Sequence, residues 1–119
     1  MAPYGSKQSF LPLGKVRGSI EFSQVSKKRY FQYLGIPYAQ PPLGKLRFAK
    51  PVAAKGWGED VRDGTLAPPI CPQPDPMALY DDSYDDPRVE DDRLIRLSHI
   101  PVIGQEDCLV LNVYRPGTD

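Results

Sequence analysis

Few residues in this sequence could carry out chemistry. His99 is the single histidine, and Cys71 and Cys108 are the two cysteines. There is no G-x-S-x-G motif to present a serine nucleophile, no H-G-G run to build an oxyanion hole, and no glycine motif of the kind that binds phosphates. We therefore predict no catalytic and no cofactor-binding residue in this chain. His99 lies among leucines and isoleucines, and we interpret it as structural or exposed.

The residue types also disfavour a bound metal. A structural zinc site needs about four nitrogen or sulfur ligands, which one histidine and two cysteines cannot provide. Residues 75–92 are rich in aspartate, but they lack the D-x-D-x-D-G-x5-E spacing and the glycine of a calcium loop. We interpret this acidic run as a solvated loop and predict no metal site.

The two cysteines have two interpretations. Cys71 and Cys108 could form a disulfide that closes a long surface loop, or they could be two buried free thiols. Counting residues does not choose between them.

Charge is divided between the two halves of the 119-residue chain, a length that suits one domain or part of one. Residues 1–62 carry 11 Lys and Arg against 3 Asp and Glu, whereas residues 63–119 carry 4 against 12. A basic arm that binds nucleic acid or an acidic membrane is one interpretation. We favour two surfaces of one folded unit, because the longest basic run is only residues 27–29. We expect no nucleic-acid partner.

No apolar stretch approaches the ~18–20 residues that a transmembrane helix needs. Residues 1–14 also lack the apolar core of a signal peptide. We therefore expect neither feature, and we expect residues 1–12 to be disordered.

The remaining pattern predicts strands and loops with little helix. Residues 14–22 alternate, with Val16, Gly18, Ile20 and Phe22 on one face, and residues 27–35 form a second strand candidate joined to the first as an antiparallel pair. Residues 108–114 are almost continuously apolar, as in a strand covered on both faces. Residues 91–100 could form one short helix.

The segment GIPYAQPPLGKLRF, residues 35–48, must run extended or in turns because its three prolines fix φ and remove donors. We expect Phe48 to be buried and the adjacent Arg47 to need a carboxylate partner, Glu106 or Asp107. The alternative is that these are ordinary surface charges. Trp57 lies between two glycines, and we interpret it as an aromatic plug, a loop side chain that fills a gap.

Several of these stretches resemble the N-terminal part of the type-B carboxylesterases, the family of cholinesterases, juvenile-hormone esterases and non-catalytic neuroligins. The resemblance begins with the G-x-x-x-G at residues 14–18. It continues in FQYLGIPYAQPPLGKLRFAKP at residues 31–51, CPQ at residues 71–73 and EDCLVLNVYRP at residues 106–116.

The resemblance implies an α/β fold, the N-terminal part of an α/β-hydrolase. It would comprise a small antiparallel sheet plus the first strand or strands of the central sheet, with residues 1–119 a partial single domain. It also implies a Cys71–Cys108 disulfide, a buried structural salt bridge between Arg47 and Glu106, and a loop between the cysteines that forms part of the wall above the active site.

The function implied is that of a longer serine carboxylesterase, which acts on small-molecule carboxylic esters through an acyl-enzyme. The triad would lie downstream, so this chain alone would be inactive scaffold. Alternatives are a non-catalytic, neuroligin-like interaction protein and a truncated standalone product. Residues 72–107 contain no tryptophan, which argues against a choline ester substrate. The implied disulfide favours secretion or the endoplasmic reticulum lumen, although no signal peptide is visible.

Overall fold

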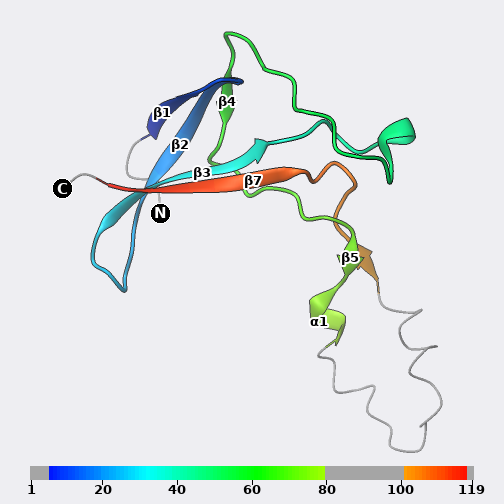
Figure 1. Cartoon of the computed structure of the whole chain (residues 1–119). Helices are drawn as coiled ribbons and strands as arrows, with labels where there is room; N and C mark the ends of the chain where they lie inside the picture. Colours follow the sequence, from blue (N-terminus) through cyan, green and yellow to red (C-terminus); the bar gives the residue numbers. More distant parts are fainter. Residues whose placement is uncertain (1–5, 80–100, 118–119) are drawn as a thin grey trace, which may run out of the picture.

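The computed structural model describes residues 6–79 and 101–117, and most of its strands belong to one sheet (Figure 1). That sheet has the order β1-β2-β3-β7, with β4 paired to β2. Its strands are β1 (Ser6–Leu11), β2 (Gly14–Phe22), β3 (Arg29–Pro37), β4 (Val61–Asp63) and β7 (Val110–Pro116). A separate two-stranded ribbon consists of β5 (Gln73–Pro74) and β6 (Val102–Ile103), and the helices are η1 (Gly44–Leu46) and α1 (Pro76–Leu79).

The predicted antiparallel pair is β2 and β3. The bounds of β2 match the predicted residues 14–22, and Ile20 faces Phe31 across the ladder. The second strand begins at Arg29 rather than residue 27, because Lys27 still belongs to the turn: its N–H donates to the Ser23 carbonyl at 2.9 Å.

Part of the segment 1–12, which we expected to be disordered, forms β1 in the structure. The strand pairs with β2 in unbroken register from Ser6↔Ser19 to Leu11↔Gly14. A short turn after Leu11 lets the chain fold back at once, so β1 satisfies the backbone groups along the second edge of β2. Residues 1–5 lie outside the described part of the chain.

The core lies on β2 and β3. Its buried hydrophobic residues are Val16, Phe31, Tyr33, Ile36 and Ala39, with Ile20 and Trp57 packed against the cluster. Val16 is fully buried, as its face predicts. Ser19, whose side chain lies on the opposite face of β2 from Val16 in the alternating pattern, is also buried. Its hydroxyl donates to Glu21 Oε1 at 2.7 Å.

The two glycines of the G-x-x-x-G motif allow close contacts at the core. A Cβ at Gly18 would overlap the Gln32 carbonyl oxygen and the Tyr33 ring. Gly14 has a φ of +144° and lies against the Trp57 indole, whose Nε1 donates to the Lys15 carbonyl at 2.7 Å. Trp57 therefore is the loop-borne aromatic plug that its flanking glycines suggested.

The expected small sheet and the expected central-sheet strand are continuous, because β3 pairs with β7. The antiparallel register runs from Tyr30↔Pro116 to Pro37↔Val110 and is interrupted by a bulge between Tyr33 and Ile36. At the bulge Gly35 has a φ of +68°, and its N–H donates to Asn112 Oδ1 at 3.1 Å. The irregularity thus keeps its backbone hydrogen-bonded.

Within the described part of the chain, β7 pairs on one side only, with β3. Its apolar side chains Leu111, Val113 and Tyr114 are all exposed, so the expected cover on both faces is not found in this chain. The short helix expected over residues 91–100 and the structural role expected of His99 lie outside the described residues.

Candidate functional site

The two cysteines meet at the base of a long loop. Cys71 and Cys108 are joined by a disulfide with a Cα–Cα distance of 5.1 Å, inside the usual span of such bonds. Neither cysteine is free, so the interpretation as two buried thiols is wrong. The bond places residues 71 and 108 side by side although they are 37 positions apart.

A second link between the two ends of the loop lies beside the disulfide, and the sequence did not predict it. In the β5–β6 ribbon Gln73 pairs with Ile103 and Pro74 with Val102. Backbone bonds at both ends extend it: Asp75 N–H donates to the Pro101 carbonyl at 2.8 Å, and Gln105 N–H donates to the Ile70 carbonyl at 2.9 Å. The base of the loop, which we call the neck, therefore comprises residues 70–75, 101–105 and 108.

Gly104 is the sequence signal that could have revealed the ribbon. Its φ is +96°, and a Cβ there would meet the carbonyl oxygens of Ile70 and Cys71. A glycine directly after the apolar pair Val102–Ile103 marks a close approach of two backbones at the end of a short strand.

The predicted ion pair forms with Glu106 rather than Asp107. Arg47 Nε lies 2.6 Å from Glu106 Oε1, next to the neck. The side chains of Arg47 and Glu106 are 60% and 42% exposed, so the buried setting that the resemblance implied is not present in this chain. Exposed pairs of this kind contribute little to stability because water and salt screen them.

Phe48 departs most clearly from expectation. It was expected to be buried, yet it is 97% exposed, and its φ of 59° lies in the left-handed region that bulky residues avoid. The preceding turn fixes this geometry, because Arg47 N–H donates to the Gly44 carbonyl at 3.2 Å and Ala49 N–H donates to the Leu46 carbonyl at 3.2 Å. The Arg47 guanidinium lies 5.4 Å from the Phe48 ring centroid.

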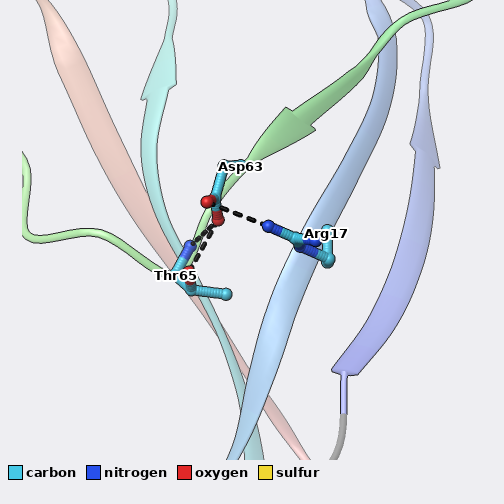
Figure 2. Close-up of polar contacts among 3 residues, drawn as sticks. All are labelled: Arg17, Asp63 and Thr65. Carbon is cyan, nitrogen blue, oxygen red and sulfur yellow. Dashed lines mark hydrogen bonds and ion pairs between the residues drawn. The ribbon is translucent and has the colours of Figure 1, made fainter.

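A polar junction at the end of β4 joins Asp63 to Arg17 of β2 and to Thr65 (Figure 2). Asp63 Oδ2 accepts a hydrogen bond from Arg17 Nη2 at 3.0 Å. Asp63 Oδ1 accepts from the Thr65 hydroxyl at 2.6 Å and from the Thr65 N–H at 3.0 Å. The two Thr65 bonds, followed by Arg17, lower the pKa of the Asp63 carboxyl below its ordinary value of 3.8.

The backbone at this junction also forms hydrogen bonds. Gly64 N–H donates to the Arg17 carbonyl at 2.7 Å, and Leu34 N–H donates to the Gly64 carbonyl at 2.8 Å. A Cβ at Gly64 would press on Val16 and the Arg17 carbonyl. The sequence signal is Asp-Gly-Thr, since aspartate readily bonds the backbone two residues on.

In residues 6–79 and 101–117, no group of three or more histidine, cysteine or acidic side chains could hold a metal ion. The same residues contain no helix long and apolar enough to cross a membrane. Of the acidic run, Asp75 is described: its Oδ1 accepts from Met77 N–H at 3.0 Å at the start of α1.

Residues 6–119 match the family model described as the Carboxylesterase family. The chain belongs to this family. The resemblance seen in its motifs is thereby confirmed.

Three curated relatives illustrate the similarity. Pyrethroid hydrolase Ces2a of Mus musculus is 43% identical over 103 residues, which cover 87% of this chain and 16% of that protein. Cocaine esterase of Oryctolagus cuniculus is 40% identical over 104 residues, with 87% and 18% covered. Juvenile hormone esterase of Tribolium castaneum is 37% identical over 106 residues, with 89% and 14% covered. The chain therefore spans less than a fifth of the length of these relatives.

Solved structures agree on the fold. A thermophilic PNB esterase superposes with a TM-score of 0.63 and 34% identity, over 94% of this chain and 18% of that one. Another PNB esterase structure gives a TM-score of 0.62 and 32% identity, with 94% and 17% covered. The predicted fold class, part of an α/β-hydrolase built mainly from strand and loop, is confirmed.

Removing the disulfide should destabilise the chain. Cys71→Ser with Cys108→Ser should lower the free energy of unfolding by about 4 kcal/mol, because the open loop restores entropy to the unfolded chain. Urea denaturation followed by circular dichroism measures this loss. Lys50→Ser with Lys55→Ser, which changes two exposed lysines outside the neck, is the control double variant. A loss below about 1 kcal/mol would contradict a stabilisation through the entropy of the unfolded chain.

The Arg47–Glu106 pair should contribute little in this chain. Arg47→Ala should lower the unfolding free energy by less than about 1 kcal/mol, since both side chains are exposed. The control is Lys45→Ala, an exposed cation two residues earlier. A loss of about 3–5 kcal/mol in urea denaturation would instead mean that the pair behaves as a buried one.

Asp63 should make stability depend on acid pH. Its pKa is lowered in the folded state, so its stabilising effect is present above the unfolded value of 3.8 and is lost as pH falls through the folded value. The difference in unfolding free energy between the wild type and Asp63→Asn should therefore be largest near neutral pH and shrink below about pH 4. Asp60→Asn serves as the exposed control. A difference that stays constant through this range would contradict the assignment.

Proposed function

We propose that this chain is the N-terminal segment of a longer carboxylic ester hydrolase and a partial single domain of it. Its role there is to provide scaffold and the base of a loop beside the active site. The observation that carries the proposal is the family match over residues 6–119, combined with the coverage of only 14–18% of the curated esterases described above.

The neck gives this role a physical basis. The disulfide and the β5–β6 ribbon hold the two ends of the loop together. A loop that lines a binding site must keep its base fixed, because small displacements of such walls weaken the positioning of a substrate. The loop itself lies outside the described residues.

The longer protein would hydrolyse small-molecule carboxylic esters through an acyl-serine intermediate. Its serine, acid and histidine would all come from sequence beyond this chain, and no residue here is assigned to catalysis, to a cofactor or to a metal. Two of the relatives are named as a pyrethroid hydrolase and a cocaine esterase. The lack of tryptophan in residues 72–107 argues against a choline ester as the substrate.

Two measurements test the proposal. The purified 119-residue chain should not hydrolyse a p-nitrophenyl ester above a mock preparation. In an extract of the source organism labelled with a tagged fluorophosphonate, an antibody to residues 14–37 should capture a labelled protein several times larger than 13.3 kDa.

The other possible results of these two measurements would favour the alternative functions. A large captured protein without label would favour the non-catalytic, neuroligin-like homologue, because its serine would be absent or not activated. A captured band near 13.3 kDa would identify a standalone short product. Ester turnover by the purified chain would overturn the view of it as inactive scaffold.

A further inference from the structure

The turn between β2 and β3 is ordered by its own hydrogen bonds. Ser23 organises it: its N–H donates to the Lys28 carbonyl at 2.9 Å and its carbonyl accepts from Lys27 N–H at 2.9 Å. Its hydroxyl also accepts from Ser26 N–H at 3.1 Å. Lys27 adopts a φ of 55° within this frame. The backbone bonds are thus satisfied inside the turn, which leaves its longer side chains at the surface.

Those side chains combine an apolar apex with positive charge. Val25 is 96% exposed at the apex, and Phe22, at the end of β2, is 47% exposed. The three basic residues that follow, Lys27, Lys28 and Arg29, are all exposed. In Figure 1 the turn projects from the sheet at the opposite end from η1.

The end of β7 adds to this basic character. Gly117 N–H donates to the Arg29 carbonyl at 2.9 Å, which holds the end of β7 beside the base of the turn. Arg115 lies nearby, with its guanidinium 4.7 Å from the Phe31 ring centroid. Residues 21–31 and 113–117 together hold four cations and one carboxylate, Glu21, which already accepts the Ser19 hydroxyl bond.

We propose that the β2–β3 turn docks on a membrane surface that contains acidic phospholipids. Val25 enters the headgroup region, while Lys27, Lys28 and Arg29 face the lipid phosphates. Attachment at a bilayer surface combines buried apolar area with attraction between cations and anionic lipids, and this turn offers both within a few residues. A nucleic acid fits less well, because an aliphatic apex offers bases no stacking surface. The proposal does not depend on the esterase role.

Vesicle cosedimentation of the full 119-residue chain tests the proposal. Binding to phosphatidylcholine vesicles that contain phosphatidylserine should exceed binding to pure phosphatidylcholine and should weaken as salt is added. Lys27→Ala with Lys28→Ala should lower the partition coefficient about 30-fold at low salt, because each lysine near an anionic surface contributes about 1 kcal/mol to binding. The matched control, Lys50→Ala with Lys55→Ala, removes two exposed lysines from the 49–57 loop and should change binding far less.

A second variant separates insertion from adsorption by charge alone. Val25→Trp places a fluorophore at the apex, and lipids brominated near the headgroup should quench it. The wild-type Trp57, which is bonded to the Lys15 carbonyl, should be quenched much less and provides the reference. Circular dichroism checks that each variant keeps the wild-type fold.

Three results would overturn the proposal. Equal binding to neutral and anionic vesicles would show that the lysines and the arginine do not attract the lipid through charge. Equal losses in the two double-lysine variants would place the attraction in the whole chain rather than in the turn. Absence of quenching at residue 25, with binding intact, would exclude entry of the apex into the bilayer.

Discussion

The pairing of β3 with β7 is the constraint on which the rest of this structure depends. It joins residues 30–37 to residues 110–116, so that a hairpin formed early in the sequence receives its last strand from the far end of the chain. The same pairing delivers Cys108 to Cys71 and Glu106 to Arg47, because both residues lie just before β7. The Tyr38 N–H, which donates to the Leu109 carbonyl at 3.2 Å, continues the contact beyond the ladder. The neck is therefore a consequence of strand register.

The small size of the core explains what the chain leaves uncovered. Five buried hydrophobic side chains lie on or just after β2 and β3, while Phe48 and the apolar residues of β7 remain in contact with water. The described residues form one sheet and a two-stranded ribbon, and a sheet without a second layer packed on it cannot cover the apolar side chains of both its faces. In the proposed longer enzyme these same surfaces would have further strands and loops against them, and the Arg47–Glu106 pair would then be screened less by solvent.

The Asp63 junction and the Arg47–Glu106 pair play different parts in the structure. Asp63 accepts two hydrogen bonds from Thr65, two positions on, and these form its turn without a distant segment. Its third hydrogen bond comes from Arg17, 46 positions away. Arg47 and Glu106 meet only after the whole sheet has assembled, since 59 positions separate them in the sequence. The Thr65 bonds could be predicted from Asp-Gly-Thr. The sequence alone suggested Glu106 or Asp107 as the partner of Arg47, and the family resemblance was needed to choose Glu106.

The sequence by itself determined the local elements and the family. Alternation in residues 14–22 defined β2, the apolar run before residue 116 located β7 to within two residues, and the proline-rich and E-D-C-L motifs identified the carboxylesterases. Only the tertiary structure decided that residues 6–11 form β1, that Ser19 is buried, that Phe48 is exposed, and that β5 and β6 pair beside the disulfide. The physical reason is that alternation and motifs report each residue's own preference. Burial and pairing depend on which other segments lie beside it: β1 pairs with the strand that follows it, whereas the β3–β7 register brings together segments far apart in the chain.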